Sequence, residues 1–112
     1  MIIYADTCGE WLVSALACYK NNYTIVTLYT NLGTEGVVYG IQQVGAKLVI
    51  TAQSLTSKLL ETLKTFDNQV EHVVYIEDPL KKMDLHTDLS GLFFVYLTKA
   101  NHSLKVFNNL TI

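Results

Sequence analysis

Strand-like and helix-like segments alternate along the first 77 residues, and this alternation constrains the fold more than any other feature of the sequence. Four short apolar runs, several of them rich in β-branched residues, predict strands at 2–5, 24–29, 47–51 and 72–77. Crossovers of helical length between them imply parallel strands, right-handed connections and helices that cover the sheet. The sequence therefore predicts an α/β fold, a partial parallel sheet of about four strands in β-α-β-α-β-α-β order.

The first predicted helix follows directly on the first strand. Thr7 and Glu10 have the spacing of a capping box, which would satisfy two free backbone N–H groups at the start of the helix. Lys20, Asn21 and Asn22 are expected to end it. One helical stripe is expected to face the sheet: Trp11, Leu12, Ala15, Leu16 and Tyr19.

Two further helices are predicted. The strand at 24–29 is apolar enough to be buried, and a turn at 31–33 leads to a helix that starts near Thr34 and Glu35 and stops at Gly45. The third helix runs from about Ser54 to Thr65. The expected inner residues are Val37, Val38 and Ile41 in the second helix and Leu55, Leu59, Leu60 and Leu63 in the third.

The pattern changes in the last quarter of the chain. Pro79 is expected to end the fourth strand because proline cannot donate to a ladder. Two strand-like pieces follow, Leu92 to Leu97 and Leu104 to Phe107, without a predictable place in the sheet. We therefore divide the chain into a partial domain at 1–84 and a divergent tail at 85–112.

Composition excludes several classes of protein. The 112 residues include eight Lys and Arg, give a net charge of −2 and contain no basic stretch, so nucleic acid is not an expected partner. The apolar run from Leu92 to Leu97 is far shorter than the roughly 20 residues that span a bilayer. We expect no transmembrane segment and no secretion signal, and we interpret the sequons at Asn22, Asn101 and Asn109 as chance matches.

The two cysteines, Cys8 and Cys18, fall on one predicted helix. Ten residues of helix separate them by about 15 Å, too far for a disulfide. Reduced thiols fit a protein that faces the cytosol. Cys8 would lie at a helix N-terminus, but its acidic neighbours oppose thiolate formation, so both cysteines are interpreted as structural.

Candidate ligand sites are weak in the sequence. The two strand–helix junctions "ADTCGEW" and "YTNLGTEG" match neither the dinucleotide fingerprint nor the Walker A pattern, and Asp6 and Glu10 would repel an anion. Asp84, His86 and Asp88 alternate in "DLHTD" and would share one face of a strand, yet no second histidine is near, which favours a solvated loop. We therefore assign no catalytic, cofactor-binding or metal-binding residue.

A family resemblance emerges when the segments are taken in order. The carriers are "ADT" followed by "EWL", the "A-ACY" helix, the "VTLY-x-x-LG" turn, "V-YGI", "ITAQSL", "KLLETLKT" and "HVVYIED". With these segments, residues 2 to 80 resemble the long-chain acyl-CoA synthetases, which are AMP-forming adenylating enzymes. The resemblance implies a fragment of the large N-terminal domain of a long-chain fatty acid–CoA ligase.

The resemblance also implies a chemistry for the parent enzyme. Such enzymes use ATP and Mg²⁺ to convert a fatty acid to an acyl-adenylate, and coenzyme A then displaces AMP. They usually work at the cytosolic face of the endoplasmic reticulum or the outer mitochondrial membrane. Partners of this chain would be the remainder of that enzyme, with fatty acid, ATP and coenzyme A bound only by the full-length protein.

Departures from the family matter for the function of this chain. The family's Tyr-Thr-Ser-Gly-Thr-Thr-Gly phosphate loop, its adenine motif, its ribose-binding Asp and its C-terminal Lys do not occur in the sequence. We therefore expect no cofactor for this chain and no activity from it alone. The alternatives are a small self-contained α/β binding or regulatory module and, more weakly, a flavodoxin-like nucleotide or flavin binder.

Overall fold

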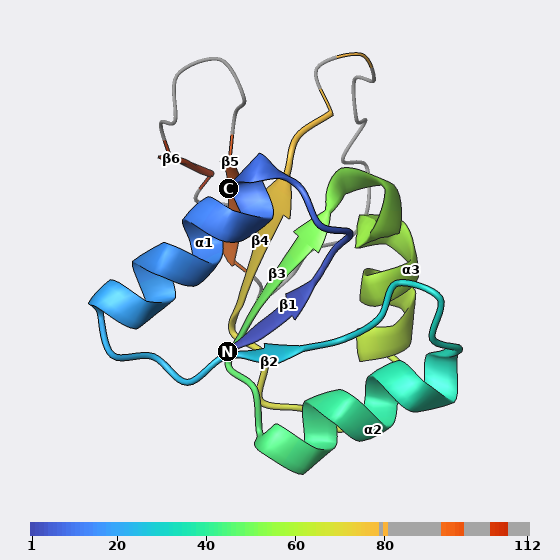
Figure 1. Ribbon diagram of the computed structural model, residues 1–112. Coiled ribbons are helices and arrows are strands. Elements are labelled where there is room, and N and C mark those ends of the chain that lie inside the picture. The colour runs from blue at the N-terminus through green and yellow to red at the C-terminus, as the bar shows by residue number, and fades with distance from the viewer. Residues whose placement is uncertain (79, 81–92, 98–103, 108–112) are drawn as a thin grey trace.

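The protein is built around one sheet whose strands alternate with helices along the chain (Figure 1). This computed structural model describes residues 1–78, 80, 93–97 and 104–107, the last two ranges as backbone only. The elements are β1 (Ile2–Tyr4), α1 (Gly9–Lys20), β2 (Val26–Thr27), α2 (Thr34–Val44), β3 (Leu48–Ala52), α3 (Gln53–Leu63), β4 (His72–Ile76), β5 (Phe93–Leu97) and β6 (Leu104–Phe107).

The strand order is β2-β1-β3-β4-β5-β6. The pairs from β2 through β5 are parallel, and β6 joins β5 in the antiparallel direction. On β1, which lies between β2 and β3, Ile3 is opposite Thr27 on one side and Ile50 on the other. The predicted fold is thus confirmed: three helices alternate with four parallel strands. The two strand-like pieces of the tail are also strands.

The helices divide between the two faces of the sheet. The α2 and α3 side chains pack with Ile2, Tyr4, Val49 and Val73 in the larger cluster of buried residues. Helix α1 packs on the other face, where Ala15 joins the smaller cluster of Ile3, Ala5, Ile50 and Ile76. Figure 1 shows α1 on one side of the strands, with α2 and α3 on the other. Parallel strands buried on both faces explain why these runs are almost continuously apolar.

Helices α2 and α3 follow the sequence prediction closely. Val37 and Ile41 of α2 are buried, as are Leu59, Leu60 and Leu63 of α3, while Val38 and Leu55 are half-buried. Gly45 ends α2 in the left-handed conformation, with φ 56° and ψ 46°. A glycine adopts this conformation without the steric cost that a Cβ brings, so the predicted stop is confirmed.

The capping box predicted for α1 is wrong. The residue that caps the helix is Cys8, its side chain makes no capping hydrogen bond, and the helix starts at Gly9. Thr7 therefore precedes the cap, and Glu10 is only two residues beyond it. The spacing of Thr7 and Glu10 is right for a capping box, but the helix begins one residue too late to use it.

The predicted inner stripe of α1 is also wrong in part. The buried residues of the helix are Ser14, Ala15 and Cys18, and Leu12, Leu16 and Tyr19 are 55%, 56% and 67% exposed. Small side chains let the helix lie close to the sheet, and this turns the larger apolar row outward. Periodicity identified a helix with an apolar side, but it did not identify the row at the centre of the contact.

The second strand is shorter and less buried than predicted. Only Val26 and Thr27 are in the ladder, at the edge of the sheet, and Thr27 is exposed. Their hydrogen bonds run from Val26 N–H to the Met1 carbonyl and from Leu28 N–H to the Ile3 carbonyl, each at 3.0 Å. A strand at the edge of a sheet has a neighbouring strand on one side only. The apolar residues at 24–29 therefore predicted more burial than this edge strand has. For the fourth strand, the residue predicted to end it, Pro79, lies outside the described residues.

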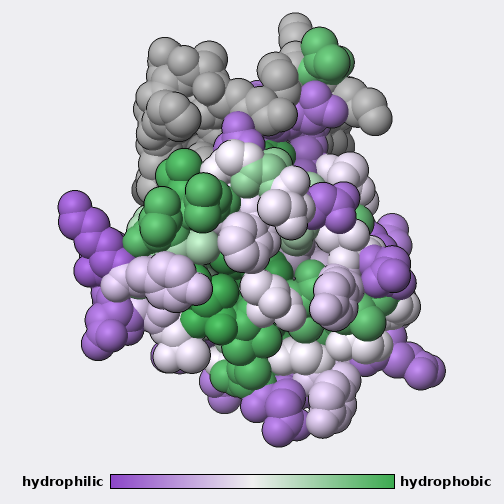
Figure 2. All heavy atoms as spheres, in the orientation of Figure 1, coloured by the Kyte–Doolittle hydropathy of each residue, from purple (hydrophilic) through white to green (hydrophobic). Residues whose placement is uncertain are grey.

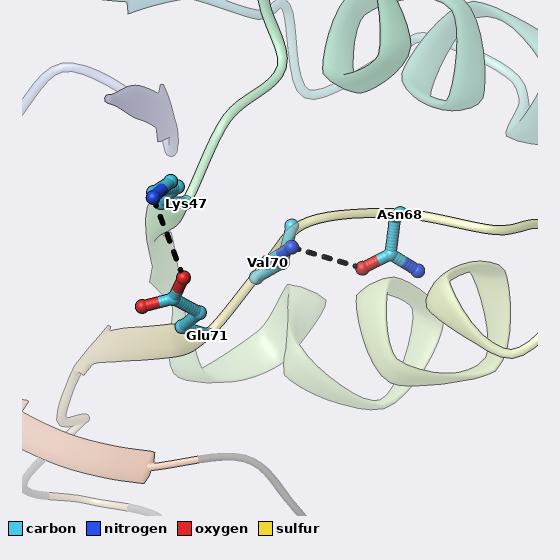
Figure 3. A network of polar contacts seen from close by, with 4 residues as sticks. All are labelled: Lys47, Asn68, Val70 and Glu71. Atoms are coloured by element: carbon cyan, nitrogen blue, oxygen red, sulfur yellow. Dashed lines mark hydrogen bonds and ion pairs between the residues drawn. The ribbon is translucent and has the colours of Figure 1, made fainter.

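The connection from α3 to β4 is fixed by polar contacts (Figure 3). The Asn68 Oδ1 accepts a hydrogen bond from the Val70 N–H at 3.1 Å, and its Nδ2 donates to the Leu63 carbonyl at 2.8 Å. The Glu71 N–H donates to the Lys47 carbonyl at 2.8 Å. Lys47 Nζ also lies 3.6 Å from Glu71 Oε1, but both side chains are mostly exposed, so this ion pair adds little to stability.

Candidate functional site

A cleft of about 360 Å³ opens at the carboxyl ends of β1 and β2. In parallel α/β sheets, ligands bind at this edge because the loops that follow the strands meet there. The cleft draws on both strand–helix junctions that the sequence analysis considered for phosphate. Its lining residues are Ala5, Asp6, Thr7, Trp11, Thr27, Leu28, Tyr29, Thr30 and Asn31.

One hydrogen bond joins the two sides of the cleft. The Thr30 hydroxyl donates to Oδ1 of Asp6 across 2.6 Å, and the two residues are 24 positions apart in the chain. Tyr29, next to Thr30, is 80% exposed. Trp11 is half-buried and packs against the smaller cluster. The cleft thus offers a carboxylate, hydroxyl groups and two aromatic rings.

The same residues do not suit a polyphosphate. Among the described residues that line the cleft there is no lysine or arginine, and Asp6 adds negative charge. Lys58 lies outside the lining, and its ammonium donates to the Leu32 carbonyl at 2.7 Å. Gly33, which caps α2, has an ordinary extended conformation with φ −67° and ψ 168°. The part of the cleft that the structure describes therefore has neither the cations nor the glycine-rich loop that cradle phosphates.

The other residues weighed in the sequence lie apart from the cleft or outside the described residues. Cys8 is half-buried and Cys18 buried, both as free thiols. Burial raises the pKa of the Cys18 thiol, although the N-terminal ammonium opposes this shift. Asp84, His86 and Asp88 fall outside the described residues. Within the part of the chain that the structure describes, no three His, Cys, Asp or Glu side chains gather as metal ligands would.

Sequence reasoning missed the pairing of Asp6 with Thr30. A signal for it existed, because each residue follows a predicted strand, and the carboxyl ends of neighbouring parallel strands meet at one edge. Sequence reasoning also gave no sign of the Tyr4 hydroxyl, which is buried without a hydrogen-bond partner among the described residues.

Comparison with known proteins settles the family. A profile described as "AMP-binding enzyme" matches residues 1–98. This chain belongs to the AMP-binding enzyme family. The matched residues of this AMP-binding chain include the four strands at 1–77 and also β5.

Three relatives of this AMP-binding chain are named as long-chain fatty acid–CoA ligases or long-chain acyl-CoA synthetases. Long-chain-fatty-acid–CoA ligase 1 of Schizosaccharomyces pombe is 34% identical over 85 residues, which are 76% of this chain and 12% of that protein. Long-chain-fatty-acid–CoA ligase 4 of Saccharomyces cerevisiae is 33% identical over 82 residues, 71% of this chain and 12% of the relative. Long chain acyl-CoA synthetase 8 of Arabidopsis thaliana is 29% identical over 76 residues, which are 68% of this chain and 10% of that protein.

The AMP-binding chain thus spans only 10–12% of the length of these relatives. It is a fragment related to the long-chain acyl-CoA ligases, as the sequence resemblance implied. Among the described residues, none of the helices has the length and apolar character needed to cross a membrane.

Proposed function

We propose that this chain is a structural part of the adenylating domain of a long-chain fatty acid–CoA ligase and forms no acyl-CoA by itself. One observation carries the proposal. Residues 1–98 match the AMP-binding family, yet the described residues that line the cleft at the ligand-binding edge of the sheet include a carboxylate and no cation. We therefore assign this segment a structural role: it forms the sheet of the adenylating domain and supplies no catalytic group.

The electrostatic requirement of the reaction supports this reading. In a full-length enzyme of the family, ATP and Mg²⁺ would supply the activated phosphate for adenylation and coenzyme A the thiol for transfer. Stabilising the charge that develops on phosphates takes lysine, arginine or metal ions placed around them. The residues of the cleft do not fit a triphosphate, so we derive no catalytic step through it. The ligase activity would belong to the longer enzyme.

The location of the parent enzyme follows as part of the same proposal. An enzyme of this family would act on the cytosolic side of the endoplasmic reticulum or of the outer mitochondrial membrane. Two free cysteines fit that side, where thiols stay reduced. Fractionation of cells that express the tagged natural protein tests this, and recovery in the secreted fraction would contradict it.

A self-contained binding module, the alternative from the sequence, would need a closed core. The large apolar side chains on the surface of α1 argue against one, since Leu12, Leu16 and Tyr19 are each more than half exposed. The strand order 2-1-3-4-5 is shared with flavodoxin-like sheets, but a shared fold does not establish a shared function. Flavin absorbance in the purified chain would reopen that alternative.

Two assays test the proposal. The purified chain is incubated with ATP, Mg²⁺, palmitate and coenzyme A, and we expect no palmitoyl-CoA above a control without protein. In a chimera, residues 1–98 replace the matching segment of the Schizosaccharomyces pombe ligase, and we expect that enzyme to stay soluble and active. Product from the isolated chain, or a chimera that folds without activity, would contradict the proposal.

A further inference from the structure

The outward side of α1 is unusual for a helix at a protein surface. Its exposed residues are Gly9, Leu12, Val13, Leu16, Ala17, Tyr19 and Lys20, and only the last is charged. By contrast, Glu61 of α3 and Lys64, the residue that caps the end of α3, are exposed. A helix that is apolar on all sides is normally buried in a larger protein. Figure 2 shows hydrophobic side chains gathered over part of α1.

Three of these side chains form a row along the helix. Leu12, Leu16 and Tyr19 are spaced at i, i+4 and i+7, which places them on one face. They are 55%, 56% and 67% exposed. We call this row, together with Val13, the outer α1 surface.

The outer α1 surface continues into a groove between the helix and the sheet. The groove has a volume of about 230 Å³, and Val13 belongs both to it and to the surface. Leu48 and Ile50 of β3 and Val74 of β4 form its floor. Both sides of a parallel sheet are normally covered, and α1 is the one described helix on this face. Helix and groove therefore form one continuous apolar surface.

We infer that the outer α1 surface and its groove dock against another segment of the same long ligase chain. This rests on the proposed function. The relatives are many times longer than their matched part, which is 10–12% of their length, so a full-length ligase of this kind would have ample chain to cover this face. The surface is nearly free of charge, so the covering segment presents an apolar face of its own. The contact is internal to the folded enzyme.

Two tyrosines make a matched test. Tyr19 lies on the outer α1 surface and Tyr39 on α2, and each is 67% exposed. Tyr39 is flanked on its helix by exposed Glu35, Gln42 and Gln43, as expected for a side that stays in water. Tyr19→Asp and Tyr39→Asp are made in the isolated chain and in the chimera with the Schizosaccharomyces pombe ligase. Soluble yield and thermal unfolding are measured in both contexts, and the association state of the isolated chain by sedimentation.

The inference predicts a difference that depends on context. In the isolated chain, both variants unfold near the temperature of the parent chain. In the chimera, Tyr19→Asp lowers the soluble yield about tenfold or more, because a buried carboxylate would lack a partner. Tyr39→Asp leaves the yield within about twofold, as a surface change does.

Several outcomes would overturn the inference. If the chimera tolerates Tyr19→Asp, the outer α1 surface is not covered in the full enzyme. If Tyr19→Asp and Tyr39→Asp lower the soluble yield of the chimera equally, the two helix surfaces do not differ. If the isolated chain dimerises through Tyr19 and the chimera tolerates Tyr19→Asp, a second copy of the chain covers the outer α1 surface. An unmodified chimera that fails to fold contradicts the proposed function as well. Loss of activity alone, with folding retained, affects only the proposed function.

Discussion

Thr30 donates a hydrogen bond from its hydroxyl to Oδ1 of Asp6 across 2.6 Å, and this contact ties the carboxyl end of β2 to that of β1. Strand β2 has only two residues in the ladder. A side-chain link beyond the end of so short an edge strand helps to fix the position of the loop that follows it.

Replacing Thr30 by valine keeps the shape of the side chain and removes the donor. We expect the free energy of unfolding to fall by about 1 kcal/mol, the usual net value of such a bond. Urea denaturation of the purified chain measures this change. Thr27→Val is the control, because Thr27 is exposed on β2, the strand that leads to Thr30, and the bond to Asp6 comes from Thr30 and not from Thr27. Equal effects in the two variants would show that the bond does not hold the edge.

The order of the elements was predictable from the sequence, whereas their exposure was predictable only in part. Alternating β-branched runs and helical periods gave the four parallel strands and three helices, and Gly45 marked the end of α2. The side of α1 that faces the sheet was not predictable, because small Ser14, Ala15 and Cys18 take the contact instead of larger apolar side chains. The antiparallel β6 depends on long-range pairing, which local pattern does not encode.

The sequence predicted which chemistry the candidate site would lack. The junction sequences lacked phosphate-loop chemistry, and no lysine or arginine stands among the described residues that line the cleft built from them. That Asp6 would meet Thr30 required the spatial order of β1 and β2. Sequence alone placed those strands next to each other in the chain and left their order in the sheet open.

Gly45 provides a test of the backbone at the end of α2. Its φ of 56° is costly for a residue with a Cβ, so Gly45→Ala should destabilise the chain by about 1 kcal/mol. Gly9→Ala is the matched control, since an added Cβ there meets no atom within 4 Å and the residue starts α1. Thermal unfolding of both variants compares them. A neutral Gly45→Ala would be inconsistent with the left-handed stop.

Tyr4 provides a test of the core. Its hydroxyl is buried without a hydrogen-bond partner among the described residues, which is an unfavourable arrangement. We expect Tyr4→Phe to raise the free energy of unfolding by about 1 kcal/mol in urea titrations. Tyr39→Phe, at an exposed position, should leave it unchanged. A loss of stability in Tyr4→Phe would mean that the hydroxyl has a partner in solution.

Cys18 gives the stability a dependence on pH. Burial raises the pKa of its thiol above the ordinary value of 9.0, and the folded state therefore favours the protonated form. Its contribution to stability is fully present below the unfolded pKa and is lost as the pH rises toward the folded pKa. We expect the free energy of unfolding to decline above about pH 9 and Cys18→Ala to weaken that decline. Identical pH profiles for the two proteins would refute the assignment.

Palmitoyl-CoA formation, measured side by side for the isolated chain and for the chimera of residues 1–98 in the Schizosaccharomyces pombe ligase, tests the central claim most directly. A framework segment without catalytic groups gives no product alone and supports turnover within the full-length enzyme. Turnover by the isolated chain would reveal a catalytic site that the cleft does not explain. A folded but inactive chimera would show that this segment does not serve such a ligase.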